Sequence, residues 1–140
     1  MKLNNFKIFI IVLLAANFLS GCYNPKNGKF VLVDAKIATG IDDKFMPTDT
    51  TDKLPAGTSK VYCWFQWRNA PKDTKIVAHW HYVSEDVSIL DYTFIIPKKN
   101  GVGSVSLEMP QGKTLPIGTY RVDLLSQNKK LKSVAFRVKD

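Results

Sequence analysis

The sequence predicts an all-β domain, on two observations. Downstream of Cys22, short runs rich in Val, Ile, Phe, Tyr and Thr recur between clusters of Pro, Gly, Asn and Asp. No segment in this region keeps apolar residues at helical spacing between capping residues. We therefore expect seven antiparallel strands, at residues 30–38, 60–67, 75–82, 89–96, 103–109, 119–126 and 132–138.

Alternation along these strands assigns their inner faces. In strand 60–67 the side chain of Cys63 shares a face with Phe65, and in strand 75–82 Trp80 shares a face with Ile76. The connecting segments each contain Gly, Pro or Asn, the residues that turns require, and they fall at 68–74, 97–102, 110–117 and 127–131.

One longer connection separates the first two strands. Residues 39–59 contain Asp42, Asp43, two prolines and Gly57, and they have little strand pattern. We expect this segment to be a variable, exposed loop.

Residues 1–21 have the features of an export signal. Two lysines and no acidic residue precede an apolar run from Ile8 to Leu19, which only Asn17 interrupts. A helix needs roughly 20 apolar residues to cross a bilayer, and this run has only about a dozen. We interpret it as a cleaved signal peptide and not as a transmembrane anchor.

The segment ends in Leu19-Ser20-Gly21-Cys22: an aliphatic residue, a small residue, a glycine and a cysteine. This motif resembles the lipobox of bacterial lipoproteins. The resemblance implies cleavage after Gly21, a diacylglyceryl group on the Cys22 thiol, and an acyl chain such as palmitate on the new amino group. The alternative is an ordinary signal peptide that happens to end beside a cysteine.

Lipidation at Cys22 would place the protein on the exported side of a membrane. Two or three acyl chains hold a protein firmly, since each buried CH₂ contributes about 0.8 kcal/mol. In Gram-negative lipoproteins an Asp after the cysteine commonly retains the protein in the inner membrane, and Tyr23 stands there instead. The resemblance therefore implies the outer membrane in a Gram-negative cell, and the cell membrane otherwise.

The chain divides into a signal peptide (1–21), a lipidated N-terminus and tether (22–29), and one domain (30–140). Removal of the signal leaves 119 residues, enough for one domain, with 18 basic and 12 acidic residues. The balance of +6 favours anionic neighbours such as lipid headgroups, envelope polymers or an acidic partner. The basic residues are mostly dispersed along the sequence, so an ordinary solvated surface is the alternative. Nucleic acid is not an expected partner of an exported protein.

Seven short strands in residues 30–140 match the size of an immunoglobulin domain. Gly118-Thr119-Tyr120-Arg121-Val122 places a tyrosine two residues before the position of the second immunoglobulin cysteine. With Cys63 and Trp80 on the second and third strands, these features resemble an immunoglobulin-like β-sandwich. The resemblance implies a core of Cys63, Trp80 and Val122 between two sheets. Val122 replaces the second cysteine. The sequence therefore resembles the bacterial immunoglobulin-like modules that lack the disulfide.

Lipidation of Cys22 would leave Cys63 without a disulfide partner. Such a cysteine is either buried as a small apolar side chain or available for an intermolecular disulfide. The strand pattern favours burial.

His79 and His81 point to one face of their strand, a spacing that can hold one metal ion. The sequence contains no third histidine, so Glu85, Asp86 or Asp91 would have to complete the site. We predict no metal site, because polar residues are common on the outer face of a sandwich. We also predict no cofactor and no catalytic residue, since the chain lacks a nucleophile elbow, a phosphate-binding glycine loop and a dinucleotide fingerprint.

Tyr62 and Trp64 fall on the outer face of strand 60–67. Exposed, they would indicate contact with a protein or glycan; covered by residues 39–59, they would form a second layer of core. A direct hairpin between strands 60–67 and 75–82 would place them opposite the two histidines. The immunoglobulin-like topology, which we expect, puts these strands in different sheets.

The sequence thus predicts a lipid-anchored, non-enzymatic binding or assembly module of the cell envelope, with an envelope protein or anionic polymer as partner. The alternative is a metal-binding or redox accessory protein that uses His79, His81 or Cys63.

Overall fold

A computed structural model describes residues 28–140 of the chain. The predicted signal peptide, the lipobox and Cys22 lie outside the described residues. The described part forms nine strands and one short 3₁₀ helix, η1 (Val83–Glu85). The strands are β1 (Val31–Ile41), β2 (Pro47–Thr50), β3 (Lys53–Pro55), β4 (Lys60–Arg68), β5 (Lys75–Tyr82), β6 (Val87–Ile95), β7 (Gly101–Glu108), β8 (Gly118–Ser126) and β9 (Lys129–Lys139).

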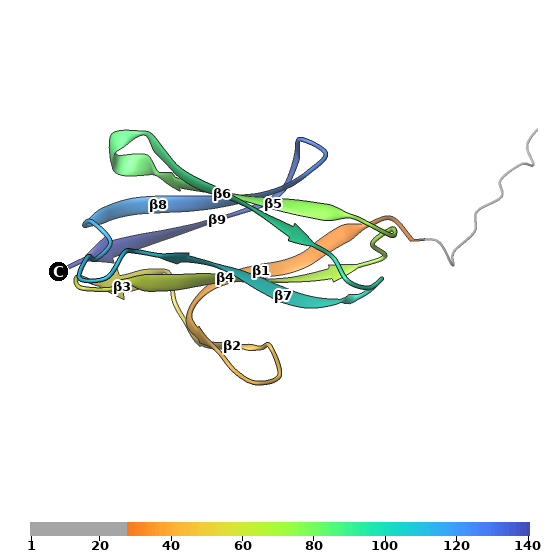
Figure 1. Cartoon of the computed structure of the whole chain (residues 1–140), viewed down its shortest axis with the longest axis horizontal. Coiled ribbons are helices and arrows are strands. Elements are labelled where there is room, and N and C mark those ends of the chain that lie inside the picture. Colours follow the sequence, from red (N-terminus) through yellow and green to blue (C-terminus); the bar gives the residue numbers. More distant parts are fainter. Residues whose placement is uncertain (1–27) are drawn as a thin grey trace, which may run out of the picture.

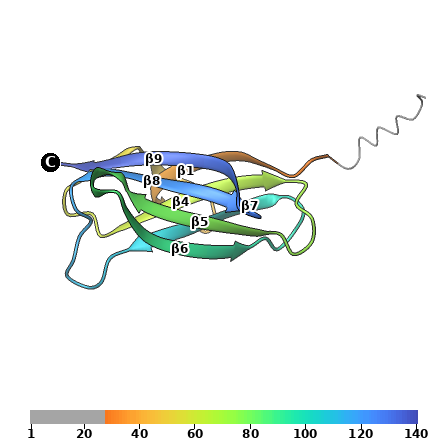
Figure 2. The same cartoon turned by 90° about the horizontal axis from the view of Figure 1, so that it is seen from above.

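The strands form two sheets that face each other (Figures 1 and 2). One sheet has the order β2-β1-β4-β7, and the other has the order β3-β9-β8-β5-β6. All strand pairs are antiparallel except β3 with β9. The fold is an all-β, immunoglobulin-like sandwich, as the sequence predicts, and β4 and β5 lie in different sheets. Residues 28–140 contain no helix that is long and apolar enough to cross a bilayer.

All seven predicted strands are present, with ends shifted by a few residues, but the prediction for residues 39–59 was partly wrong. β1 continues to Ile41, and the segment also contains β2 and β3. The hairpin between β1 and β2 is closed by the Asp42 carboxylate, which accepts hydrogen bonds from the backbone N–H groups of Lys44 (2.9 Å) and Met46 (2.8 Å). Both extra strands are short edge strands that pair through their backbones, so they lack the alternation that reveals a half-buried strand.

The core lies between the two sheets and is built from the alternate residues of β4, β5 and β8. Cys63, Trp80 and Val122, the three residues of the predicted core, are fully buried and belong to one cluster. Cys63 is a free thiol. Burial of a large apolar side chain contributes about 1.5–3 kcal/mol, so the packing of aromatic and aliphatic side chains stabilises this sandwich without a disulfide.

Tyr120 forms a tyrosine corner, the contact in which the tyrosine at this position of an immunoglobulin-like domain bonds to the backbone a few residues upstream. Its side chain is 1% exposed, and its hydroxyl donates to the carbonyl oxygen of Pro116 at 2.6 Å. The neighbouring Tyr82 hydroxyl donates to the carbonyl oxygen of Ile117, also at 2.6 Å, and the two rings lie 4.8 Å apart. Two tyrosines on adjacent strands therefore fix the segment that leads into β8.

Candidate functional site

The two histidines lie on the outer face of β5, as predicted, with their ring centroids 6.0 Å apart. His79 is paired across the sheet with Asp91 of β6, and its Nδ1 contacts the Asp91 carboxylate. His81 Nε2 lies 3.0 Å from the carboxylate of Asp86, which follows η1 in a left-handed conformation. Each imidazole thus has its own carboxylate partner.

This arrangement gives the metal-binding alternative little support. Within residues 28–140, no group of three or more His, Cys, Asp or Glu side chains is placed to hold a metal ion. Asp91 and Asp86, two of the three candidate third ligands, contact different histidines, while Glu85 ends η1. A shared site would need both carboxylates to turn toward one ion, at the loss of these pairs.

Cys63 is buried, as the strand pattern predicts. Its side chain is 0% exposed, and burial raises the pKa of its thiol to about 12. The thiolate is the reactive form of cysteine, so Cys63 is placed as a core residue and not as a redox group at neutral pH.

The two outward aromatic residues of β4 differ in their surroundings. Trp64 is 3% exposed, and its indole N–H donates to the carbonyl oxygen of Phe45, in the hairpin between β1 and β2, at 2.9 Å. Tyr62 is partly exposed, with the ammonium of Lys60 5.0 Å from its ring centre. Trp64 is therefore a second-layer core residue under the 39–59 segment, and of the two aromatic residues only Tyr62 remains partly open to solvent.

Several exposed apolar side chains gather on β6, at the edge of the larger sheet. Leu90 is 43% exposed, Tyr92 is 50% exposed and Ile95 is 61% exposed, although all three belong to a nine-residue strand. Leu90 and Tyr92 are paired with the fully buried Trp80 and Ala78 of β5. They face the core side of the sheet, and their exposure shows that the opposite sheet, which ends at β7, covers them only in part.

Every second residue of β6 directs its backbone N–H and C=O groups away from β5, where no neighbouring strand of the described chain meets them. The N–H of Ile96 donates to the carbonyl oxygen of Thr74 at 2.9 Å, which makes this a hydrogen-bonded pair. In an antiparallel ladder such pairs recur every second residue, so Phe94, Tyr92 and Leu90 bond toward β5. The backbone groups of Ile95, Thr93 and Asp91 therefore point away from the sheet, and the alternation ends at a β-bulge in which Ile89 is the extra residue. The sequence prediction missed this edge. The sequence feature that could have indicated it is that apolar residues of 89–95 fall on both faces of the strand and not on one face only.

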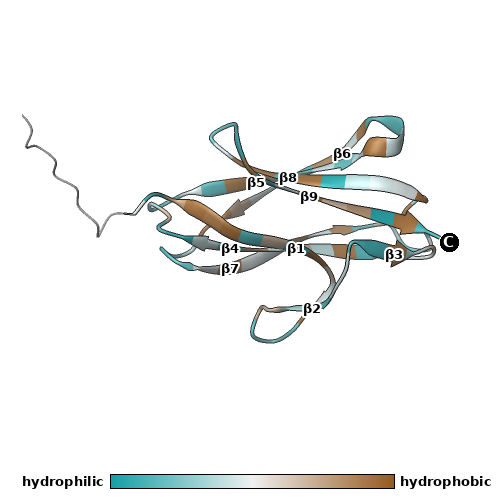
Figure 3. Cartoon of the chain, turned by 180° about the vertical axis from the view of Figure 1, so that it is seen from behind, coloured by the Kyte–Doolittle hydropathy of each residue, from teal (hydrophilic) through white to brown (hydrophobic). Residues whose placement is uncertain are grey.

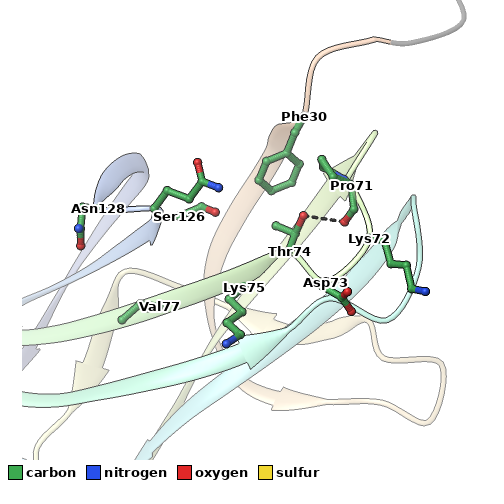
Figure 4. Close-up of a pocket in the computed structure, with 10 residues that line it drawn as sticks. Phe30, Pro71, Lys72, Asp73, Thr74, Lys75, Val77, Ser126 and Asn128 are labelled. Atoms are coloured by element: carbon green, nitrogen blue, oxygen red, sulfur yellow. Dashed lines mark hydrogen bonds between the residues drawn. The ribbon is translucent and has the colours of Figure 1, made fainter.

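A hollow lies at the end of the sandwich where the described chain begins. It has a volume of about 490 Å³ and lies between Phe30, the turn from β4 to β5, and the turn from β8 to β9 (Figure 4). The Thr74 hydroxyl closes the β4–β5 turn by donating to the carbonyl oxygen of Pro71 at 2.6 Å. Lys72, Asp73 and Lys75 are exposed at its rim, so the charged groups around the hollow sum to one positive charge.

Comparison with known proteins agrees with the fold and gives no family. No family model matches the chain, and no curated protein matches it. The structure is similar to an immunoglobulin-like protein from Pseudomonas aeruginosa, with a TM-score of 0.57 and 11% identity, over 81% of this chain and 98% of that one. At this identity the likeness shows the fold alone.

Two further solved structures are less similar. One is an alkylpurine DNA glycosylase from Pseudomonas fluorescens, with a TM-score of 0.49 and 12% identity over 81% of this chain and 31% of that chain. The other is a Niemann-Pick type C2 protein from the Japanese carpenter ant, with a TM-score of 0.42 and 11% identity over 81% of this chain and 95% of that chain. Neither likeness is close enough to carry an argument about this protein.

Proposed function

We propose that this protein is an exported lipoprotein that acts as a non-enzymatic binding module of the cell envelope. It is anchored through Cys22, and it binds an extended segment of an envelope protein along β6. The fold likeness to an immunoglobulin-like protein supports a binding module. The observation that carries the proposal is the free, apolar edge of β6.

The chemistry of β6 suits the addition of a strand. A partner strand would meet the outward backbone groups of Asp91, Thr93 and Ile95, and backbone hydrogen bonds would give it affinity. The exposed side chains of Leu90 and Tyr92 would contact alternate residues of that partner on the core side. Soluble proteins usually protect such an edge with Lys, Pro or a β-bulge. β6 contains neither Lys nor Pro, and its bulge at Ile89 lies before the free segment 90–95.

The other sheet edges are poorer docking sites. β3 has three residues, and β2 has four residues that are mostly polar and exposed. β7 begins with Gly101 and contains Gly103, which offer a partner no side chain. Among the described strands, β6 alone combines length, apolar side chains and free backbone groups.

The anchor places this edge on the exported side of a membrane, which is the outer membrane if the cell is Gram-negative. Replacement of Cys22 by Ala is expected to abolish labelling of the protein by a radioactive or clickable fatty acid. Unchanged labelling would remove the anchor from the proposal. Within residues 28–140, the metal-binding or redox alternative has no support, because the two histidines contact different carboxylates and Cys63 is buried.

The binding edge is tested by crosslinking in intact cells, with mass-spectrometric identification of what is captured. Thr93→Lys places a charge on the free edge of β6, and Thr50→Lys is the matched control on β2, the edge of the other sheet. Both threonines are exposed, so both variants are expected to fold. We expect Thr93→Lys to lose the crosslinked partner and Thr50→Lys to keep it. An equal yield from both variants, or no reproducible partner of the wild type, would refute the proposal.

A further inference from the structure

The structure collects basic residues that are dispersed along the sequence at one end of the sandwich. This end, which we call the basic pole, comprises residues 28–31, 67–76, 95–101 and 125–131. It contains eight basic residues and one acidic residue, Asp73. The basic residues are Lys29, Arg68, Lys72, Lys75, Lys98, Lys99, Lys129 and Lys130.

The pole accounts for the whole positive balance of the described chain. Its formal charge is +7, whereas the rest of residues 28–140 has nine basic and eleven acidic residues, a balance of −2. All eight basic side chains are exposed. Seven of them make no ion pair within the described residues, and Lys130 lies 3.8 Å from the carboxylate of Asp123. The charge at the pole is therefore directed to solvent.

The register of the strands explains why these segments meet. β1 begins opposite the end of β4, since Val31 pairs with Arg68, and β7 begins beside the same end, since Trp67 pairs with Gly101. In the other sheet, β5 begins where β6 and β8 end. The turns β4–β5, β6–β7 and β8–β9 therefore lie at the end from which the N-terminal segment leaves (Figures 1 and 2). These turns are hydrophilic (Figure 3).

Hydrogen bonds hold the basic turns and the emerging chain together. The carbonyl oxygens of Lys98 and Lys99 accept from the Trp67 indole N–H and from the Ala70 N–H, each at 2.9 Å. The Asn69 amide donates to the Lys29 carbonyl oxygen at 3.4 Å, and the Asn69 N–H donates to the Asn100 side chain at 2.9 Å. The lysines thus project from a fixed backbone that also fixes where the tether starts.

Apolar groups accompany the charges. Ile95 is 61% exposed and Val31 is 45% exposed, and Pro71 and Pro97 are exposed in the turns. Pro71, Ile95 and Pro97 line a hollow of about 480 Å³ together with Lys72, Lys98 and Lys99. Basic residues around exposed apolar ones are the pattern of a surface that rests at the headgroup level of a membrane.

We propose that the basic pole binds the anionic headgroups of the bilayer that holds the lipid anchor, so that the sandwich stands on the membrane by this end. This inference rests on the anchor proposed at Cys22. The occupant follows from where the tether starts: eight residues, Cys22 to Lys29, extend at most about 28 Å. The β1 strand of 11 residues spans roughly 36 Å, so in this orientation the opposite end of the sandwich is held away from the surface.

The pole acts as a second membrane signal besides the acyl chains. Each Lys or Arg near an anionic bilayer strengthens binding about fivefold, within a Debye length of about 8 Å at physiological salt. An upright sandwich also holds β6 at an angle to the membrane, with its far end at Val87 and only Ile95 in the pole, so that the rest of its free edge stays accessible to a partner (Figure 1).

The test measures binding of the unlipidated chain to vesicles, so that its result is independent of lipidation at Cys22. Residues 22–140 with Cys22→Ser contain every strand of the sandwich and lack the apolar run of the signal. The chain is sedimented with phosphatidylcholine vesicles and with vesicles in which a third of the lipid is phosphatidylglycerol. The pole variant carries Lys72→Glu, Lys98→Glu and Lys99→Glu. The control carries Lys53→Glu, Lys113→Glu and Lys139→Glu, which change the net charge equally at exposed sites off the pole.

We expect the wild-type chain to bind the anionic vesicles, to show no binding to the neutral vesicles, and to dissociate when salt is added. The pole variant should bind at least roughly 100-fold more weakly, and the control should stay within about threefold of the wild type. Equal weakening of both variants would mean that net charge alone acts, and would overturn the inference. Failure to bind anionic vesicles, or binding to soluble polyphosphate with no binding to vesicles, would overturn it in favour of no ligand or an anionic polymer. If the chain binds anionic vesicles through the pole but is not labelled by fatty acid in cells, the proposed lipid anchor is refuted and the inference about the basic pole stands.

Discussion

The tyrosine corner offers a matched pair of substitutions, because Tyr120 and Tyr82 make the same hydrogen bond in different surroundings. Each hydroxyl donates to a backbone carbonyl at 2.6 Å, to Pro116 and to Ile117. Tyr120 is 1% exposed, whereas Tyr82 is partly exposed. Replacement by Phe removes one oxygen from each residue and keeps both rings.

The expected losses differ because the hydrogen bond of Tyr120 is partly buried, whereas that of Tyr82 is exposed, where water can replace the lost hydroxyl. A hydrogen bond contributes about 1 kcal/mol net, and a buried group left without a partner costs about 1–3 kcal/mol. Tyr120→Phe is therefore expected to lower the free energy of unfolding by about 2 kcal/mol, and Tyr82→Phe by less than about 1 kcal/mol. At about 4 °C per kcal/mol for a domain of this size, Tm should fall by about 8 °C in the first variant and by less than about 4 °C in the second.

Urea titration of residues 22–140 with Cys22→Ser measures both values, and tryptophan fluorescence reports the transition. The midpoint should move while the slope of free energy against urea stays constant, since both variants keep the fold. Equal losses in the two variants would show that burial of the hydroxyl does not decide its contribution. A larger loss of unfolding free energy in Tyr82→Phe than in Tyr120→Phe would refute the view that Tyr120 is the main residue fixing the segment that leads into β8.

Three further outcomes are expected. The native protein purified from membranes should not react with a thiol reagent at neutral pH, and after unfolding it should titrate one thiol, Cys63; two thiols would mean that Cys22 is unmodified. Burial, and secondarily the charge of Tyr82, raises the pKa of Tyr120 to about 12, so its contribution to stability is present below its ordinary pKa of 10 and is lost as pH rises through 12. This alkaline loss should be smaller in Tyr120→Phe by urea titration; an unchanged loss would assign it to other groups. Burial would raise the pKa of Asp123, but the Ser133 hydroxyl and two nearby cations lower it below its usual 3.8. Asp123→Asn should therefore destabilise the protein at pH 7 and progressively less below pH 4. A loss of stability that does not depend on pH would exclude this ionised network.

Where the sequence prediction failed, the physical reason is specific. The alternation of apolar residues predicted β4, β5 and β8, because each has one face in the core. β2 and β3 pair through their backbones at the edges of the sheets, and backbone pairing has no requirement for side-chain pattern. Trp64 and Tyr62 are equivalent by alternation, and only the hairpin between β1 and β2 distinguishes them, by covering Trp64.

The candidate surfaces divide in the same way. His79 and His81 are visible in the sequence as an i, i+2 pair on one strand face, but their partners Asp91 and Asp86 are fixed by the register of β6 and by the turn after η1. The free edge of β6 follows from sheet order, since a strand is an edge only through the absence of a neighbour.

By itself, the sequence determined the all-β class, the strands that line the core, the buried place of Cys63 and the predicted lipobox, because each depends on residue type and local spacing. The tertiary structure alone decided which strand lies at the edge and where charge accumulates. Lysines and arginines from four separate segments form one pole because strand order and register bring those segments to the same end of the sandwich. Such long-range pairing leaves no trace in local sequence pattern.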